Sequence, residues 1–156
     1  MTEIYLFDWG DTLMVDFPNT PGKMCDWEIV ETIDGAEETL KFLSERSKIY
    51  IATGAAQSSK DDIAKAFKRV NLDKYITDYF CKSNLGFDKE NPEFFPSILK
   101  KLGKISKQVT VVGDNFNKDI KPAIELGMNA ILLSKNKRSS KNDSYRTINS
   151  LKELCF

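Results

Sequence analysis

Two aspartates, Asp8 and Asp114, each stand directly or almost directly behind a short apolar run, Ile4–Phe7 and Val109–Val112. A carboxylate in that position serves as a metal ligand, as a nucleophile or as the cap of the following turn. If both runs are strands of one parallel sheet, the two carboxylates meet at its carboxyl edge and repel each other unless a cation joins them. Mg²⁺ prefers such a site, in which carboxylates, water and a substrate phosphate share the ion.

Three further positions carry groups that suit an anion. Thr53 and Gly54 follow another apolar run and offer a hydroxyl and backbone N–H groups to a phosphate, or they form an ordinary turn. Lys89 is either a compact positive charge facing that phosphate or a solvated surface lysine. Asp119, five positions past Asp114, either orients Lys89 or a metal-bound water, or is an acid at a helix start.

The residue types that are absent or rare narrow the chemistry. The chain has no histidine, which excludes Ser-His-Asp and Cys-His catalysis and every histidine-ligated metal site. The three cysteines, Cys25, Cys81 and Cys155, are widely separated and form no Cys-x-x-Cys pair, so we expect buried structural thiols in a reducing compartment. Any bound metal is therefore expected to be a hard cation held by carboxylates, Mg²⁺ before Ca²⁺.

The overall composition is that of a globular domain. The 156 residues are 41% hydrophobic, and 23 basic side chains balance 23 acidic ones. Zero net charge excludes a nucleic-acid binder that works through bulk positive charge, although a local patch stays open. The N-terminus lacks a signal-peptide pattern, and no apolar run approaches the roughly 20 residues that span a bilayer. We expect a soluble cytoplasmic protein with no membrane partner.

The elements that must position these side chains alternate between short β-rich runs and helical patterns. The predicted strands are Ile4–Phe7, Ile49–Ala52, part of Ile76–Cys81, Val109–Val112 and Ala130–Leu133, and the predicted helices are Gly35–Arg46, Ser58–Val70, Pro92–Leu102 and Asn117–Leu126. A basic surface loop, Ser134–Ser144, then leads to a last short strand and a closing helical turn within Tyr145–Phe156. Strand–helix alternation predicts an α/β fold, a parallel sheet with helices on both faces.

Four motifs in this order resemble those of the haloacid dehalogenase-like (HAD) hydrolases. They are Phe7–Leu13 (FDWGDTL), Ile49–Gly54 (IYIATG), Gly86–Pro92 (GFDKENP) and Val112–Asp119 (VGDNFNKD). The first and fourth are the most specific, and the resemblance runs from about Ile4 to the C-terminus. It implies a HAD-type Rossmann-like parallel sheet and a single core domain over residues 1–156.

The resemblance also implies a phosphatase mechanism. Asp8 would be the nucleophile that attacks phosphorus and forms an aspartyl-phosphate, which water then hydrolyses. Its carboxylate, the backbone carbonyl of Gly10 and the side chain of Asp114 would hold Mg²⁺. The partner would be a phosphorylated substrate of unknown identity.

The remaining motif residues receive supporting roles from the same resemblance. Thr53 and the Gly54 N–H would bind phosphate oxygens. Lys89 would bind the phosphate and balance the charge that grows in the transition state, and Asp119 would hold Lys89 in place. Positioning and charge stabilisation would then supply most of the catalysis.

One departure from the family pattern concerns proton transfer. Most phosphatases of the family carry a second aspartate two positions after the nucleophile, where it protonates the leaving group and then activates water. This chain has Gly10 there and Asp11 one position later. Asp11 either replaces the missing acid in part or is a turn residue with an unusual φ, and we favour the turn. The rival function is a catalytically weak phosphate-binding or interaction module that retains the site.

A second departure is the lack of room for a cap domain. The stretches after the first motif and between the second and third are too short for an independent small domain of roughly 40 residues. A capless core has an open site, which suits a large substrate or a second copy of the chain that covers it. The segment Phe17–Trp27 is predicted to form a small lid whose aromatic rings pack against the core.

Two other classes fit less well. A phospho-receiver domain has a phosphorylated aspartate, a threonine, a lysine and acidic Mg²⁺ ligands, but its first strand supplies an acidic pair and its acceptor comes in mid-chain. Here a lone Asp8 opens the chain and Lys89 precedes the Gly-Asp motif. A dehalogenase of this family normally carries a helical cap, for which this chain has no space.

Overall fold

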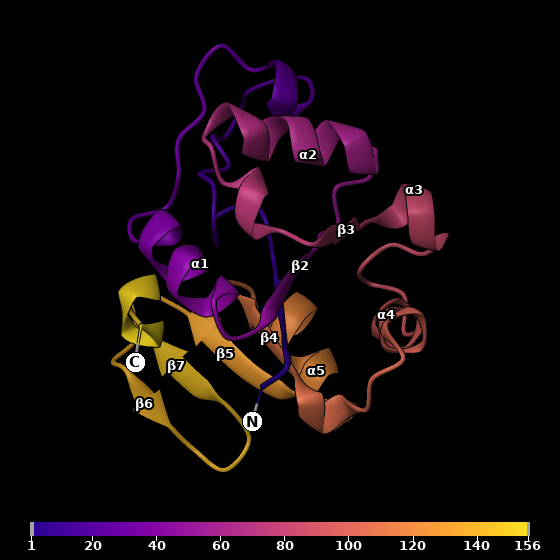
Figure 1. Cartoon of the computed structure of the whole chain (residues 1–156), viewed down its shortest axis with the longest axis vertical. Helices are drawn as coiled ribbons and strands as arrows, with labels where there is room; N and C mark the ends of the chain where they lie inside the picture. Colours follow the sequence, from indigo (N-terminus) through magenta and orange to yellow (C-terminus); the bar gives the residue numbers. More distant parts are fainter. Residues whose placement is uncertain (1, 156) are drawn as a thin grey trace.

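A computed structural model describes residues 2–155 of the chain, and Met1 and Phe156 lie outside the described part. Its centre is a seven-stranded sheet with the strand order β3-β2-β1-β4-β5-β7-β6 (Figure 1). The strands are β1 (Ile4–Phe7), β2 (Lys48–Ala52), β3 (Asp78–Phe80), β4 (Val109–Gly113), β5 (Asn129–Leu133), β6 (Ser140–Lys141) and β7 (Arg146–Ile148). Every neighbouring pair is parallel except β6 and β7. The predicted α/β fold with a parallel sheet is confirmed, with one antiparallel strand at its edge.

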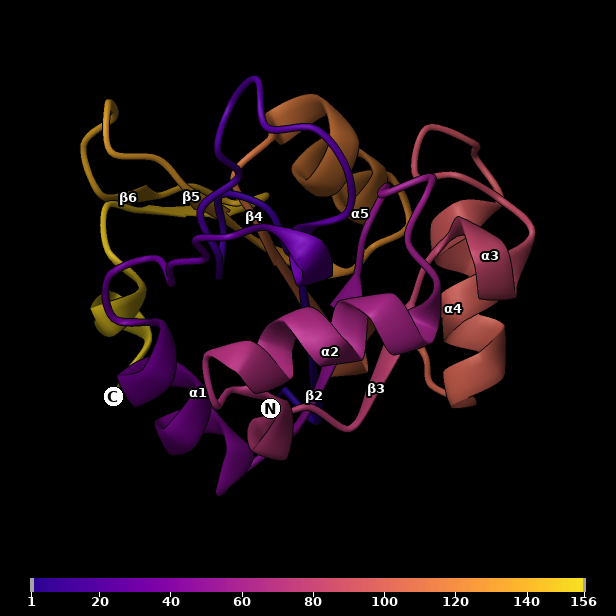
Figure 2. The ribbon, with the colours of Figure 1, turned by 90° about the horizontal axis from the view of Figure 1, so that it is seen from above.

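Helices cover both faces of the sheet, as predicted. One face packs against α1 (Ala36–Ser44), α2 (Lys60–Arg69) and a short 3₁₀ helix at Leu151–Leu154, and the other against α4 (Phe94–Leu102) and α5 (Lys121–Glu125). In Figure 2, α1 and α2 lie on one side of the strands and α5 lies on the other. The alternation of strand side chains creates the two cores: Phe7 of β1 belongs to the first and Leu6 to the second, and both are fully buried.

Helix α2 shows how the sequence fixes these elements. The Ser59 hydroxyl accepts the Asp62 backbone N–H at 3.2 Å, and the Asp62 carboxylate accepts the Ser59 N–H at 2.9 Å. This capping box satisfies two donors that the first turn would otherwise leave unpaired. Ile63 and Phe67, four positions apart, are completely buried on the face turned to the sheet.

The structure differs from the predicted elements at the fourth motif. Instead of one helix over Asn117–Leu126, a π-helical turn at Phe116–Ile120 precedes the short α5. Pro122 has no backbone N–H to donate to the fourth residue before it, so a regular α-helix cannot run through this point. Additional short helices occur at α3 (Lys82–Leu85), Met24–Asp26, Asp73–Tyr75 and Ser106–Gln108.

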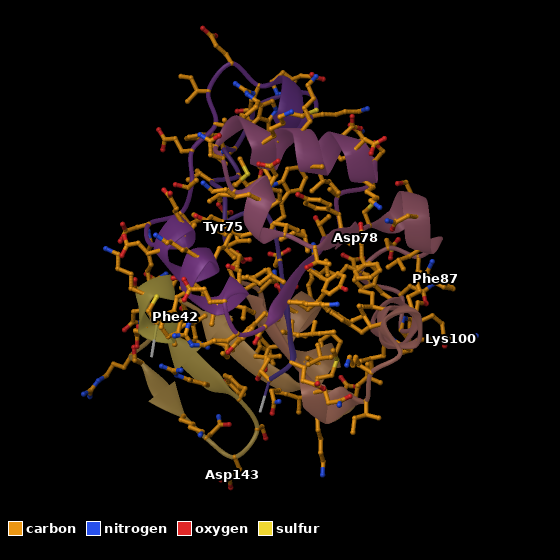
Figure 3. All side chains as sticks on the ribbon, in the orientation of Figure 1. Phe42, Tyr75, Asp78, Phe87, Lys100 and Asp143 are labelled. Carbon is orange, nitrogen blue, oxygen red and sulfur yellow. The ribbon has the colours of Figure 1, made fainter. Side chains whose placement is uncertain are left out.

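The C-terminal region also corrects two predictions. The predicted loop Ser134–Ser144 contains strand β6, whose two exposed polar residues carry no hydrophobic alternation that would have revealed it. Asp143 projects from the tip of this hairpin at the periphery of the molecule (Figure 3).

Cys25 and Cys81 are free and buried as expected, but Cys155 is only half-buried. The predicted closing turn is a 3₁₀ helix at Leu151–Leu154, and its last predicted residue, Phe156, lies outside the described residues.

Among residues 2–155, no cap domain is inserted after β1 or between β2 and α4, in agreement with the prediction. The segment Phe17–Trp27 forms a short irregular lid whose 3₁₀ turn, Met24–Asp26, packs against α2 (Figure 1). The rings of Phe17 and Trp27 lie 6.4 Å apart, Trp27 is buried, and Phe17 packs against the first core. Within the described part of the chain, every helix is also too short or too polar to cross a bilayer.

Two basic side chains fasten this lid. The Arg69 guanidinium donates to the backbone carbonyls of Cys25, Trp27 and Glu28, and Lys23 Nζ lies 2.9 Å from an Asp62 carboxylate oxygen. Because Arg69 and Asp62 both belong to α2, the lid is held to a rigid element of the fold.

Arg69→Met keeps the aliphatic stem but removes the hydrogen bonds to Cys25 and Trp27 of the lid and to the adjoining Glu28. We expect urea denaturation to show a loss of about 1–2 kcal/mol and amide exchange in residues 24–28 to accelerate, because charged hydrogen bonds are worth that much when partly exposed. Arg46→Met is the matched control, since Arg46 donates to one exposed carbonyl, that of Phe42. Equal exchange in the lid of both variants would show that Arg69 does not hold it.

Candidate active site

One cleft gathers all the residues predicted for the site. It opens at the carboxyl ends of β1, β2 and β4, has a volume of about 560 Å³, and lies where the strand order reverses between β1 and β4. Its lining includes every predicted site residue, namely Asp8, Gly10, Thr53, Gly54, Lys89, Asp114 and Asp119. Residues from the lid and from the first turn also line it, among them Asp11, Asp16, Gly22, Lys23, Met24 and Trp27.

The centre of the cleft is a buried ammonium group. Lys89 is 6% exposed, and its Nζ lies 2.8 Å from Asp8 Oδ1, 2.6 Å from Asp119 Oδ1 and 2.9 Å from the Ala52 carbonyl oxygen. Asp119 is itself 1% exposed. A lysine buried to this extent needs paired charges to remain ionised, and the two carboxylates supply them. Lys89 is therefore not the solvated surface lysine that the sequence also allowed.

The proton affinities of these groups follow from burial and from their mutual charges. Burial opposes ionisation of Lys89, but the Asp8 and Asp119 carboxylates outweigh it and raise the pKa of Lys89. Burial likewise opposes ionisation of Asp8, but the Lys89 ammonium outweighs it and lowers the pKa of Asp8. Desolvation and the nearby Asp8 carboxylate raise the pKa of Asp114 to about 7. Burial also raises the pKa of Asp119, with the Lys89 ammonium opposing. One ammonium thus faces three carboxylates, and the cleft has a surplus of negative charge.

A threonine that we did not single out from the sequence links the two strand-end aspartates. The Thr12 hydroxyl lies 3.2 Å from Asp8 Oδ2 and 3.3 Å from Asp114 Oδ1, and Thr12 is completely buried. It reaches them because Thr12, Leu13 and Met14 all donate their backbone N–H groups to the Trp9 carbonyl, which folds the chain back beneath Asp8. Nothing in the spacing of Thr12 alone revealed this contact.

The same carboxylates form a donor set for a metal ion. Asp8, Asp114 and Asp119 each place one oxygen within 4.8 Å of the others. Asp119 is committed to Lys89 in the interior, so Asp8 and the exposed Asp114 are the two that face the cleft. An all-oxygen set with surplus negative charge fits a hard dication such as Mg²⁺ and offers none of the soft or imidazole ligands that zinc or copper prefer. Gly10 lines the cleft beside them.

Thr53 and Gly54 lie where an anion would be held. Thr53 is 4% exposed, and its hydroxyl oxygen accepts the Ala55 N–H at 3.1 Å, so the hydroxyl proton remains to be donated. A Cβ on Gly54 would stand 3.3 Å from the Lys89 Cβ, which shows how closely this backbone passes the lysine. The two residues therefore place a hydroxyl and a bare backbone next to the buried ammonium.

The first turn decides between the two interpretations of Asp11. Asp11 has a φ of 60°, the left-handed conformation that we favoured for a turn residue. Its carboxylate accepts the Asp16 backbone N–H at 3.0 Å, so it stabilises the turn. Asp16, which the sequence motifs did not point to, lines the cleft together with Asp11. Partial burial and the Asp11 and Asp8 carboxylates raise the pKa of Asp16.

The family model of the haloacid dehalogenase-like hydrolases matches residues 10–127, about three quarters of the chain. Among curated proteins, a glyceraldehyde 3-phosphate phosphatase of Methanocaldococcus jannaschii is 38% identical over 89 residues, which are 55% of this chain and 39% of that protein. A protein of the same name from Methanothermobacter thermautotrophicus is 28% identical over 75 residues, 48% of this chain and 33% of that protein. The matched region thus spans well under half the length of these relatives.

Solved structures share the fold over nearly the whole chain. An uncharacterized protein from Listeria monocytogenes serotype 4b superposes with a TM-score of 0.83 at 20% identity, covering 99% of this chain and 95% of that one. The HAD-hydrolase YfnB of Bacillus subtilis, in a magnesium-bound form, gives a TM-score of 0.76 at 17% identity, covering 98% and 96%. With the motifs on the carboxyl edge of a sheet of this topology, and with the family model matching most of its length, the chain belongs to the haloacid dehalogenase-like hydrolases.

Proposed function

We propose that this protein is a Mg²⁺-dependent phosphatase that hydrolyses a phosphomonoester through an aspartyl-phosphate at Asp8. The observation that carries the proposal is the placement of Asp8. One of its oxygens is fixed by the buried Lys89 ammonium at 2.8 Å, while the other lies on the side of Thr12 and Asp114. Support also comes from the two archaeal relatives that are named phosphatases.

The chain's own residues supply the substrate-binding and nucleophilic groups. Asp8 is ionised, because Lys89 keeps the pKa of its carboxyl low, and an ionised carboxylate is the nucleophilic form. The Thr53 hydroxyl and the Gly54 N–H would bind the phosphoryl oxygens next to the Lys89 ammonium. That arrangement orients phosphorus towards Asp8 and stabilises the charge on the transferring group.

The carboxylates at the ends of β1 and β4 suit a divalent cation. The side chains of Asp8 and Asp114, with the carbonyl of Gly10, would hold Mg²⁺ at the point of surplus negative charge. A bound Mg²⁺ neutralises the phosphate charge that a carboxylate nucleophile would otherwise repel.

Asp119 acts as a positioning residue, and Gly113 makes its position possible. A Cβ on Gly113 would stand 2.3 Å from Asp119 Oδ2 and 2.6 Å from its Cβ, so the Asp119 side chain occupies the space that any larger residue would need. The Asp119 carboxylate in turn lies 2.6 Å from Lys89 Nζ. Strand β4 therefore sets the position of Lys89 through Asp119.

A second candidate function is a phosphate-binding module with little turnover. Gly10 favours it, because a general acid at that position is the part of the family's machinery that this chain lacks. The open cleft also leaves space for a second copy of the chain or a large substrate to cover the site. Measured turnover decides between the enzyme and the binding module.

Asp8→Asn tests the proposed function. We expect phosphate release with Mg²⁺ to fall by at least about 10³-fold, because the amide is not a nucleophile, while the thermal midpoint stays near that of the wild type. The panel should include p-nitrophenyl phosphate, acetyl phosphate, glyceraldehyde 3-phosphate, and sugar and nucleotide monophosphates. Undiminished turnover by the variant would contradict the covalent mechanism, and an inactive wild type that still binds phosphate would establish the binding module.

Asp114→Asn tests the metal site. We expect the dissociation constant of Mg²⁺, measured by calorimetry on the protein alone, to rise by about 10–100-fold or more, because one charged ligand is lost. Asp143→Asn is the matched control, since this aspartate is exposed at the hairpin tip. If both variants bind Mg²⁺ as the wild type does, the ion is held by other groups.

Gly113→Ala tests the positioning of Lys89. We expect a loss of about 1–3 kcal/mol of stability from overpacking and a fall of roughly 10²-fold in kcat, because Asp119 and Lys89 must move. Gly103→Ala is the control: Gly103 has a φ of 64° with open space around it, so alanine costs roughly 1–2 kcal/mol of stability without touching the site. Equal kcat in the two variants would remove Asp119 from the mechanism.

A further inference from the structure

Gly10 stands where most phosphatases of the family carry a second aspartate, and in the structure the Asp16 carboxylate lies beside it. Gly10 has no side chain, and a Cβ built on it would stand 3.2 Å from the Asp16 Cβ, 3.5 Å from its Cγ and 3.4 Å from its Oδ2. The Asp16 side chain therefore fills the volume next to Gly10 into which a side chain at position 10 would project. Asp16 also lines the catalytic cleft together with Asp8.

The local backbone holds Asp16 in this place. Gly10 and Met14 pair through a β-bridge, and Met14 pairs in turn with Thr32. The Val15 N–H donates to the Glu31 carbonyl at 2.9 Å, and the Asp16 N–H donates to the Asp11 carboxylate at 3.0 Å. Asp16 thus stands on a fixed backbone and is not on a freely moving loop.

Asp11 and Asp16 have different roles in the first turn. Asp11 has a left-handed backbone, and its Oδ1 is engaged by the Asp16 N–H. Asp16 is on the exposed side of the cleft, whereas the Asp8 side chain is only 14% exposed and lies deeper. In an in-line displacement the leaving oxygen is opposite the nucleophile, so it would face outwards, on the side where Asp16 stands.

We propose that Asp16 is the general acid and base that takes the place of the aspartate missing at position 10, with Asp11 as the residue that positions it. This inference rests on the proposed phosphatase function. When the Asp8 carboxylate oxygen bonds to phosphorus, the ester P–O bond breaks and the Asp16 carboxyl gives its proton to the leaving alkoxide, which departs as the alcohol. The Asp16 carboxylate then takes a proton from the water that attacks the aspartyl-phosphate, and inorganic phosphate and free Asp8 result.

The experiment compares leaving groups, because a general acid matters most when the leaving oxygen is strongly basic. kcat/KM is measured with Mg²⁺ for p-nitrophenyl phosphate and for an alkyl ester, glycerol phosphate, with the wild type, Asp16→Asn and Asp11→Asn. We expect Asp16→Asn to lower kcat/KM for the alkyl ester by about 10²–10⁴-fold and to lower it for the aryl ester by a much smaller factor. Asp11→Asn, whose amide oxygen still accepts the Asp16 N–H and tolerates the left-handed φ, should change the ratio of the two substrates little.

A second experiment moves the carboxyl group from position 16 to position 10. Asp16→Ala removes the carboxyl group beside Gly10 and leaves only the Asp16 Cβ, 3.2 Å from a Cβ built at position 10. The double variant Gly10→Asp/Asp16→Ala then places the acid at position 10. We expect the double variant to recover at least about 10-fold of the alkyl-ester activity that Asp16→Ala loses. Thermal midpoints close to that of the wild type would confirm that the substitutions at positions 10 and 16 leave the fold intact.

The outcomes separate the inference from the function on which it rests. Asp16→Asn could lower kcat/KM equally for both esters, or Asp11→Asn could be the variant that loses kcat/KM selectively for the alkyl ester. Either result would overturn the role of Asp16, while turnover that depends on Asp8 would still support the phosphatase function. A wild type that releases no phosphate from either ester would overturn both, because no leaving group would then need a proton.

Discussion

The buried ammonium of Lys89 is the interaction on which the site depends. It lies among two carboxylates and a carbonyl oxygen in a part of the molecule that excludes most water, and there an unpaired charge would cost several kcal/mol. Asp8 and Asp119 come from different strand ends, so the ion pairs also join the loops after β1 and β4. The pairing keeps Asp8 ionised and fixes the position of one of its oxygens. The parallel sheet is the frame that brings these chain-distant residues to one edge.

The charge that Lys89 leaves unbalanced explains the rest of the cleft. Asp114 faces the Asp8 carboxylate across the Thr12 hydroxyl, and burial together with repulsion from Asp8 raises the pKa of Asp114. A divalent cation with oxygen ligands removes that repulsion, which is why a magnesium site and a phosphoryl-transfer site coincide in the proposal. The short lid, tied to α2 by Arg69 and Lys23, contributes Gly22, Lys23, Met24 and Trp27 to the lining of the cleft.

Much of this could be predicted from the sequence, because strand ends and turns leave local signals. Apolar runs followed by Asp8, Thr53 and Asp114 predicted the sheet, its helical cover and the convergence of these residues at one edge. The features that were missed depend on contacts between residues without a local pattern. Thr12 reaches Asp8, and Asp16 reaches the cleft, only through the folding of the first turn, and β6 is too short and polar to produce a strand signal. The π-helical turn at Phe116–Ile120 stands just before Pro122, which lacks the backbone N–H that a regular helix would use there.

If the Asp8 carboxylate bonds to phosphorus, the resulting aspartyl-phosphate can be trapped during turnover. The wild-type protein would be mixed with Mg²⁺ and acetyl phosphate, quenched during turnover, reduced with borohydride and mapped by peptide mass spectrometry. An acyl phosphate is reduced to an alcohol, so we expect homoserine in place of Asp8 and an unmodified Asp114. Full turnover with Asp8 unmodified, or with the modification at another carboxylate, would contradict the proposed mechanism.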